Sequence, residues 1–227
     1  FMKTLAIIPA YNEEASIAAT IEELKQAVPK MDFLVINDGS RDNTRCICRK
    51  QGYNLLDLAA NVGLTGGFQA GVKYALRNGY DAVLQFDADG QHVPQFINPM
   101  IKQMQTTESD IVIGSRFVTE KKDHSARMIG SRLISAMIAM TTGQHINDPT
   151  SGMRLFNHRA MEYFGQMNDF GPEPDSIAYL IRKGLTVSEV QVSMREREAG
   201  ESYLNATRSI EYMLRTCISI LLVQWFR

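Results

Sequence analysis

The chain has 227 residues, 44% of them hydrophobic and 22% charged, and its formal net charge is −1. This length and composition are typical of one globular domain with or without an appendage, and the near-neutral charge argues against a protein that coats nucleic acid. The three cysteines show no disulfide-framework spacing, and Met2 leads into a short strand pattern rather than a long apolar leader. We therefore expect a cytoplasmic protein without a nucleic-acid partner.

Strand and helix patterns alternate through the first half of the chain. Short apolar runs predict strands at 5–8, 33–36, 54–58, 82–86 and 111–113, and apolar residues at helical spacing predict helices at 13–28, 44–51, 66–78 and 94–105. Strands separated by helices of this length form βαβ units. The predicted fold class is therefore α/β, with a mainly parallel central sheet flanked by helices.

The second half is less regular. Its patterns predict helices at 125–142, 174–183 and 203–225 and a strand at 186–192. The last helix carries a broad apolar stripe with Arg208, Arg215 and Arg227 nearby, but its apolar stretch is too short to cross a bilayer. Two roles stay open for it, peripheral contact with a membrane surface and contact with a second subunit in a homo-oligomer.

Polar clusters follow three of the predicted strands, where Tyr11, Asp38, Asp87 and Asp89 lie. Ligands of parallel α/β sheets bind beyond the carboxyl ends of the strands, so we expect these side chains to converge on one crevice. Two carboxylates at positions i and i+2 provide oxygen ligands of the kind that Mg²⁺ or Mn²⁺ prefers. Gln91 and His92 extend the same loop and offer further ligand atoms, and the alternative is a solvated turn.

The segment after the first strand suits a nucleoside. The ring of Tyr11 and the polar groups of Asn12 and Glu13 can stack on a base and hydrogen-bond to a ribose, and Asp38 can accept a hydrogen bond from the base. The same residues also fit a helix start, with Asn12 as the N-cap and Glu13 favoured by the helix dipole.

Eight short motifs occur in order along the chain. They are IPAYNE at 8–13, NDGSRDNT at 37–44, NVG at 61–63, DADGQH at 87–92, GSR at 114–116, DPTSGMR at 148–154, EVQV at 189–192 and REAGES at 197–202. Together they resemble glycosyltransferase family 2, which has the GT-A fold, in its branch of dolichol-phosphate mannosyltransferase-like and bacterial polyprenyl-phosphate glycosyltransferases. The resemblance reaches about Tyr203, which implies a GT-A domain at 1–203 and a C-terminal apolar helix at 204–227.

The resemblance also implies roles for individual residues. It implies a nucleoside site formed by Pro9, Tyr11, Glu13, Asp38 and Asp87. It implies a Mg²⁺ or Mn²⁺ ion held by Asp87, Asp89 and Gln91. It implies catalytic, phosphate-binding or acceptor-binding roles for Arg116, Arg154, Arg197 and Ser202; the alternative for the arginines is a surface ion pair.

The resemblance further implies an inverting transfer of a hexose or N-acetylhexosamine from a nucleotide-sugar donor, with a UDP-sugar favoured. The acceptor that the resemblance implies is a polyprenyl phosphate or a glycan of the cell envelope or another glycoconjugate. An anionic lipid phosphate needs no general base, whereas a hydroxyl acceptor does. For that base Asp175 and then Glu173 resemble the acidic pair of related enzymes; the alternative is that both only begin the helix at Pro174.

Departures from the family pattern put the acceptor in doubt more than the donor. Met153 stands where an aromatic residue is usual, Gln191 stands where proline is usual, and no pair of membrane-spanning patterns follows the last motif. The enzyme is expected in the cytoplasm, at the inner face of the cell membrane if the last helix is interfacial. Transfer to a protein-linked glycan, a nucleotidyltransferase and a non-catalytic nucleotide-binding module stay open as alternatives.

Overall fold

The computed structural model describes residues 2–120, 122, 126–167, 170–195 and 206–222. The strands are β1 (Thr4–Ala10), β2 (Asp32–Asn37), β3 (Leu55–Asp57), β4 (Ala82–Gln85), β5 (Ile111–Ser115), β6 (Arg154–Asn157) and β7 (Val187–Gln191). The helices are α1 (Ile17–Ala27), α2 (Thr44–Lys50), α3 (Gly63–Arg77), a short 3₁₀ turn η1 (Pro94–Phe96), α4 (Ile97–Thr107), α5 (Ala126–Thr142), α6 (His158–Gln166), α7 (Pro174–Arg182) and α8 (Ala206–Leu221).

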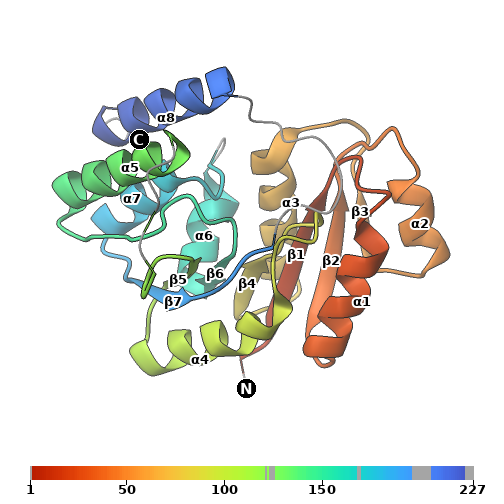
Figure 1. Ribbon diagram of the computed structural model, residues 1–227. Helices are drawn as coiled ribbons and strands as arrows, with labels where there is room; N and C mark the ends of the chain where they lie inside the picture. Colours follow the sequence, from red (N-terminus) through yellow and green to blue (C-terminus); the bar gives the residue numbers. More distant parts are fainter. Residues whose placement is uncertain (1, 121, 123–125, 168–169, 196–205, 223–227) are drawn as a thin grey trace.

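The strands form one sheet in the order β3-β2-β1-β4-β6-β5-β7, in which β6 runs antiparallel to both β4 and β5 and the other pairs are parallel. The predicted mainly parallel α/β sheet is confirmed (Figure 1). The sequence prediction missed β6 and α6, because β6 has only four residues and follows a polar turn, so no alternation of useful length marks it.

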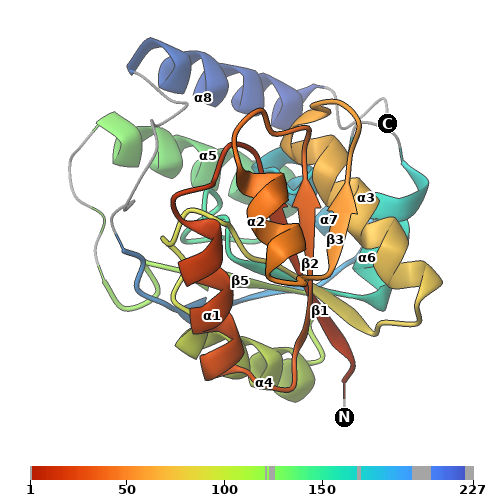
Figure 2. The same cartoon turned by 90° about the vertical axis from the view of Figure 1, so that its right-hand side faces the viewer.

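Helices cover both faces of the sheet (Figure 2). The alternation of side chains along β1 explains why. Leu5 and Ile7 belong to a buried cluster that includes residues of α3, α5, α6, α7 and α8, whereas Ala6 and Ile8 belong to a second cluster with residues of α1, α2 and α4. Successive side chains of a strand point to opposite faces, so an almost wholly apolar strand predicts burial on both sides.

The last helix packs on the outside of this framework. α8 contacts α5 and α7, and Met213 of α8 lies directly over Gly130 of α5, where a larger side chain would collide with it. Cys217 and Ile220 of α8 are buried in the larger core cluster. Within the described part of the chain, no helix is long and apolar enough to cross a membrane.

Candidate active site

The loops after β1 and β2 are fastened to each other by backbone-to-side-chain hydrogen bonds. The Asn12 N–H donates to Ser40 Oγ (3.1 Å), the Arg41 N–H donates to Asn12 Oδ1 (2.9 Å), and the Glu13 N–H donates to Thr44 Oγ1 (2.8 Å). Asn12 adopts a positive φ of 57°, which asparagine tolerates better than most residues.

The prediction that Asn12 caps the first helix is wrong, because α1 begins only at Ile17 with Ser16 as its N-cap. Asn12 instead uses its side chain to hold the loop after β2. Pro9, Tyr11 and Glu13 lie half-buried along or just beyond the end of β1, at the edge of the sheet where a nucleoside was expected.

Asp38 is buried at the carboxyl end of β2 and holds the start of α3. Its two carboxylate oxygens accept hydrogen bonds from the N–H groups of Val62 (2.7 Å) and Gly63 (2.9 Å), and its carbonyl accepts one from the side chain of Asn61 (3.2 Å). A carboxylate is stabilised by the N–H groups at a helix N-terminus. Asp38 therefore shapes the predicted nucleoside site, and a direct contact with the base stays a prediction.

The Asp87-Ala88-Asp89 loop follows β4 as expected. Asp89 is buried and accepts the Gln91 N–H on Oδ1 (3.1 Å), whereas the Asp87 carboxylate is about one-third exposed, at 35%. The amide of Gln91 donates to the carbonyl of Arg195 (3.3 Å). His92 Nδ1 accepts the Asp87 N–H (2.9 Å), so this nitrogen is occupied within the protein and is not a free metal ligand.

The acid pair, Glu173 and Asp175 at the N-terminus of α7, lies under α8. Tyr212 donates to Glu173 Oε2 (2.5 Å), and Ser219 donates to Asp175 Oδ2 (2.5 Å), while Asp175 Oδ1 accepts the Ser176 N–H (3.0 Å). Burial raises the pKa of Glu173, although Tyr212 and the neighbouring guanidinium oppose this. Both candidates for a general base are thus held by residues of the C-terminal helix.

Arg154 is almost completely buried, with 2% of its surface exposed. Its two terminal nitrogens donate to the carbonyls of Pro149 (2.6 Å) and Pro172, so the guanidinium joins the turn before β6 to the turn before α7. Burial lowers its pKa, which the nearby Glu173 carboxylate opposes. In this structure the Arg154 guanidinium donates hydrogen bonds to backbone carbonyls, and a contact with phosphate stays a prediction.

Arg116 forms a two-pronged ion pair with Asp148. Nε donates to Oδ2 (2.7 Å), and Nη2 donates to Oδ1 (2.9 Å). Burial alone raises the pKa of Asp148, but the hydrogen bonds and charge of Arg116 outweigh it and hold that pKa below its usual range. Glu189 of β7 accepts the N–H groups of Asn147 and Asp148, which fixes the same loop from the other side.

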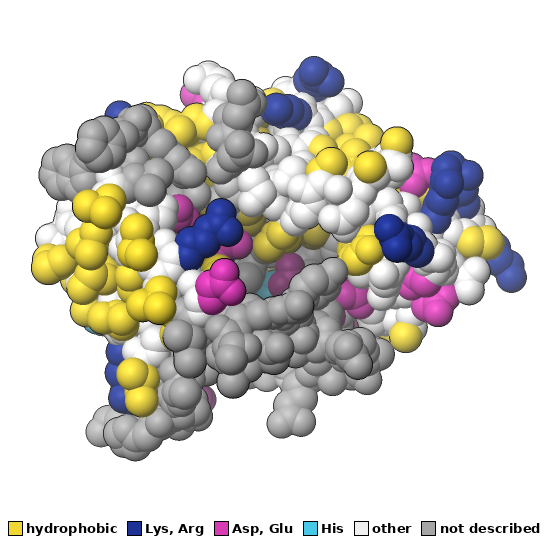
Figure 3. All heavy atoms as spheres, turned by 90° about the horizontal axis from the view of Figure 1, so that it is seen from above, with side chains coloured by type: hydrophobic (Ala, Val, Ile, Leu, Met, Phe, Trp, Pro, Cys, Tyr) yellow, Lys and Arg dark blue, Asp and Glu magenta, His cyan; other side chains and the backbone are white. Residues whose placement is uncertain are grey.

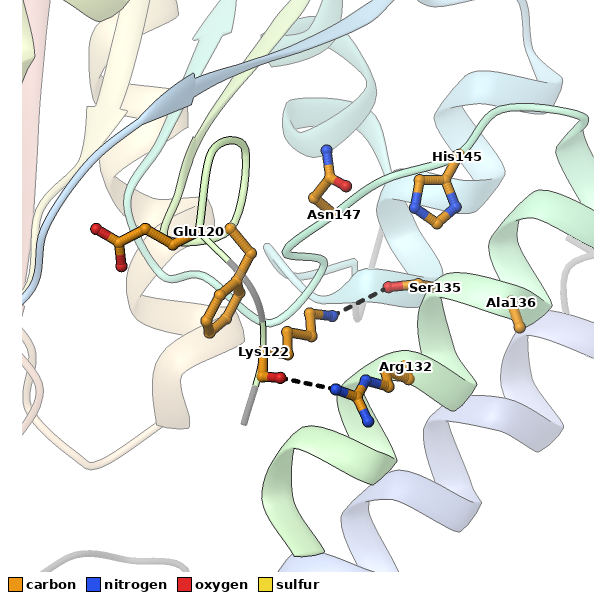
Figure 4. A pocket seen from close by; sticks show the side chains of 8 residues that line it. Glu120, Lys122, Arg132, Ser135, Ala136, His145 and Asn147 are labelled. Atoms are coloured by element: carbon orange, nitrogen blue, oxygen red, sulfur yellow. Dashed lines mark hydrogen bonds between the residues drawn. The ribbon is translucent and has the colours of Figure 1, made fainter. Parts of the chain in front are cut away.

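A pocket of about 530 Å³ lies between α5 and the loops that carry Glu120 and Asn147 (Figure 4). The Lys122 ammonium donates to the hydroxyls of Ser131 (2.8 Å) and Ser135 (3.4 Å), and Arg132 donates to the Lys122 carbonyl (2.7 Å). Burial lowers the pKa of Lys122. The carboxylate of Glu120 points away from the ammonium in Figure 4, whereas the charges of Asp148 and Glu189 also act on it.

The model of the family described as glycosyl transferase family 2 matches residues 5–165, which is more than half of the chain. The chain belongs to this glycosyltransferase family. An undecaprenyl-phosphate mannosyltransferase of Micrococcus luteus is 32% identical over 90% of this chain and 88% of the relative. A UDP-N-acetylglucosamine–dolichyl-phosphate N-acetylglucosaminyltransferase of Methanococcus voltae is 30% identical over 82% of this chain and 83% of the relative.

The fold of this glycosyltransferase is likewise shared with solved structures. Glucosyl-3-phosphoglycerate synthase from Mycobacterium tuberculosis, crystallised with Mn²⁺, UDP-glucose and phosphoglyceric acid, superposes with a TM-score of 0.72 at 18% identity, over 98% of this chain and 79% of that chain. The predicted GT-A fold, the predicted family and the predicted enzyme class are confirmed.

The residues of the glycosyltransferase's Asp87-Ala88-Asp89 loop fit a divalent cation in a particular way. Within the described residues, no three His, Cys, Asp or Glu side chains form a group that could hold a metal. Two carboxylates that are completed by donor phosphates are, however, the usual coordination of Mg²⁺. Asp87 and Asp89 would hold the ion, which would neutralise charge on the leaving nucleoside diphosphate.

Sequence reasoning missed Lys122, Tyr212 and Ser219. Each acts through a contact between distant segments, and no short motif surrounds any of them. The only sequence signal was the position of Tyr212 and Ser219, seven residues apart and hence on one side of a helix. The predicted site residues Arg197 and Ser202 lie outside the described residues, and their roles stay predictions.

Proposed function

We propose that the enzyme transfers a hexose or N-acetylhexosamine, with inversion, from a nucleoside-diphosphate sugar to a polyprenyl phosphate. A UDP-sugar is the favoured donor and Mg²⁺ or Mn²⁺ the expected cofactor. The pocket whose lining includes the cationic side chains of Lys122 and Arg132 is the observation that carries the choice of acceptor. A half-buried ammonium whose described hydrogen bonds go to hydroxyls offers its charge to an anion, and phosphate oxygens are strong acceptors of charge-assisted hydrogen bonds.

The contacts of the acid pair support the same acceptor. Asp175 accepts hydrogen bonds on both carboxylate oxygens, and Glu173 is bonded to Tyr212. A phosphate acceptor is already anionic and needs no carboxylate to take a proton. Its oxygen attacks the anomeric carbon, the bond from that carbon to the donor phosphate breaks, and the bonding electrons leave with the nucleoside diphosphate.

A second acceptor class is favoured by one observation. The raised pKa of Glu173 is typical of a general base, and a hydroxyl acceptor, such as that of a glycan, would need one. In that case Glu173 would have to exchange its bond to Tyr212 for one to the acceptor.

The outer face of α5 and α8 supports a location at the membrane surface. Exposed apolar side chains follow one another along both helices, namely Ile129, Leu133 and Met140 of α5, Leu214 and Ile218 of α8, and Leu222 directly after α8. Figure 3 shows hydrophobic side chains gathered on the side of the molecule where these helices lie. The relatives named above act on undecaprenyl or dolichyl phosphate, so we propose a lipid surface as the partner of this face.

The acceptor is tested by incubating the purified full chain with undecaprenyl phosphate in detergent micelles, Mn²⁺, and UDP- or GDP-linked hexoses and N-acetylhexosamines. Mass spectrometry of the lipid fraction should show one sugar added to undecaprenyl phosphate, and the donor that supports it names the base. Transfer to a sugar hydroxyl but never to the lipid would overturn the phosphate acceptor, and Glu173→Gln should then abolish that transfer.

The membrane contact is tested separately by flotation with liposomes that contain anionic lipids. Wild type should float, and Ile218→Glu should stay with the soluble fraction while keeping its activity on acceptor in micelles. Serine in place of Cys46, which is exposed on α2, provides a surface control that should float like wild type. Failure of wild type to float, together with a dimer in light scattering that Ile218→Glu dissociates, would instead assign the face to a second subunit.

A further inference from the structure

The imidazole of His92 contacts Asp87 at two points. His92 Nδ1 accepts the backbone N–H of Asp87 (2.9 Å), and His92 Nε2 lies 3.5 Å from the carboxylate atom Oδ2 of the same residue. One ring thus holds both the main chain and the side chain of Asp87. Gln85 reaches the other carboxylate oxygen, with Nε2 3.5 Å from Oδ1.

The hydrogen bond from the Asp87 N–H determines which ring nitrogen of His92 carries the hydrogen. Because Nδ1 accepts a hydrogen bond, a neutral imidazole must carry its hydrogen on Nε2. That nitrogen is the one that faces Oδ2 of Asp87. The ring nitrogen that carries the hydrogen is therefore the one that lies 3.5 Å from the carboxylate.

The surroundings of His92 leave the ring little freedom. Only 3% of the residue is exposed, and its ring packs edge-on against Phe86 with centroids 5.4 Å apart. The backbone of His92 forms an antiparallel bridge with Met194, and the adjacent Arg195 N–H donates to the Gln91 carbonyl (3.0 Å). Burial, backbone pairing and the hydrogen bond from the Asp87 N–H keep the imidazole in place, so its position does not depend on the Phe86 contact alone.

Gly152 closes the space on the other side of the pair. A Cβ atom at this position would lie 2.8 Å from Asp87 Oδ2 and 3.3 Å from His92 Nε2. The first distance is too short for any real side chain, so the turn before β6 leaves room for the pair only because residue 152 is glycine. Gly152 thus leaves the space that the Asp87–His92 contact occupies, and a larger residue at this position would disturb that contact.

We propose that His92 is a positioning residue that holds the Asp87 carboxylate in the orientation needed to bind the metal and donor ribose. This inference rests on the proposed function, because it assumes that Asp87 contacts the donor and its cation. Groups that orient a metal-binding side chain commonly change metal affinity or activity by about 10–100-fold when they are removed. An effect of that size is expected here.

Three substitutions separate the two contacts. His92→Phe fills the space but makes neither, His92→Asn keeps an acceptor near the place of Nδ1, and His92→Gln keeps a donor near the place of Nε2. Phe86→Leu is the matched control, because it alters the packing of the ring without removing a polar contact. Calorimetric titration with UDP and with GDP, each with and without Mn²⁺, gives the part of nucleotide affinity that depends on metal, and melting of the free proteins reports folding.

We expect His92→Phe to lower the Mn²⁺-dependent affinity about 10–100-fold, and His92→Asn and His92→Gln each to recover part of the loss. Phe86→Leu should lower the melting temperature but leave the metal-dependent part of the affinity as in wild type. Equal metal-dependent affinity in His92→Phe and wild type would overturn this inference alone. Absence of any metal-dependent nucleotide binding in wild type would overturn the proposed metal dependence as well.

Discussion

The proposed donor side, formed by the loops after β1, β2 and β4, and the proposed acceptor side, formed by α5, α7, α8 and the pocket at Lys122, are built from different kinds of contact. On the donor side, backbone N–H groups are bonded to side-chain oxygens of another loop, as between Glu13 and Thr44 or between Val62 and Asp38. On the acceptor side, the contacts that α8 makes with Glu173 and that Lys122 makes with α5 join one side chain to another, as between Tyr212 and Glu173 or between Lys122 and Ser131. Side-chain pairs of this kind exchange for water or ligand more easily than the backbone of a loop can move.

This difference indicates which half of the site has its binding geometry before substrate binds. The donor loops are fixed by the fold itself, so their geometry in the free protein should resemble that of the donor complex. The acceptor side depends on α8 lying over α7 and on charged groups that share a pocket with hydroxyls. Four substitutions, taken from the largest expected effect to the smallest, break or sharpen this contrast.

The largest effect is expected at the Arg116–Asp148 pair, which belongs to the rigid part of the acceptor side. Arg116→Met leaves the completely buried Asp148 carboxylate without its cation, which should cost about 3–5 kcal/mol of unfolding free energy. Urea denaturation at neutral pH measures this, and the double variant Arg116→Met/Asp148→Asn should recover part of the loss.

The pH dependence of this pair has a definite sign. In wild type the pKa of Asp148 is lowered, so its contribution to stability is present above its usual value near 3.8 and is lost as pH falls through the lowered pKa. Without Arg116, burial dominates and raises the pKa, so the defect of Arg116→Met should shrink as pH falls. A defect that stays constant down to acid pH would show that the carboxylate gains another partner.

The next effect concerns the donor side. Asp89→Asn removes charge from a buried residue of the metal loop and should lower kcat/KM by at least about 100-fold, at the upper end of the range for altered metal sites. Its melting temperature without ligands should change little, because the Gln91 N–H still finds an oxygen acceptor. Unchanged turnover and an unchanged Mn²⁺ response would show that Asp89 does not bind the metal.

The third effect separates the acceptor from the donor. Lys122→Met should raise KM for the lipid phosphate about 10–100-fold, since a hydrogen bond to a charged group contributes about 1.5–3 kcal/mol. The affinity for UDP should not change, and Ser135→Ala is a milder control because it removes only one hydroxyl partner. A weakened affinity for UDP with an unaltered acceptor KM would show that Lys122 contributes to donor binding instead.

Lys122 also predicts how acceptor binding depends on pH. Burial lowers its pKa, so the ammonium loses its proton at a less alkaline pH than an exposed lysine does. Acceptor KM in wild type should therefore rise on the alkaline side, whereas Lys122→Arg should hold its KM constant there because a guanidinium stays charged.

The same contrast explains how far the sequence predicts this molecule. Strand and helix periodicity predicted the sheet, and polar residues at strand ends predicted that Asp38, Asp87 and Asp89 lie at its carboxyl edge. The sequence did not predict that Asn12 holds the neighbouring loop, because local patterns for an N-cap and for a loop contact are the same. Nor did it predict Lys122 or Tyr212, whose partners are set by the packing of α5 and α8.

The smallest effect is expected where α8 meets the acid pair. Tyr212→Phe removes one hydrogen bond to Glu173 and should lower the unfolding free energy by about 0.5–1.5 kcal/mol. Because the pKa of Glu173 is raised, its contribution to stability is full below its usual value near 4.5 and is lost as pH rises through the raised pKa. Glu173→Gln does not titrate, so relative to wild type it should gain stability as pH rises from about 4.5 to neutral. Denaturation of both variants across this range tests the contact, and a pH profile of Glu173→Gln parallel to that of wild type would mean that Glu173 is freely solvated and that α8 does not cover it.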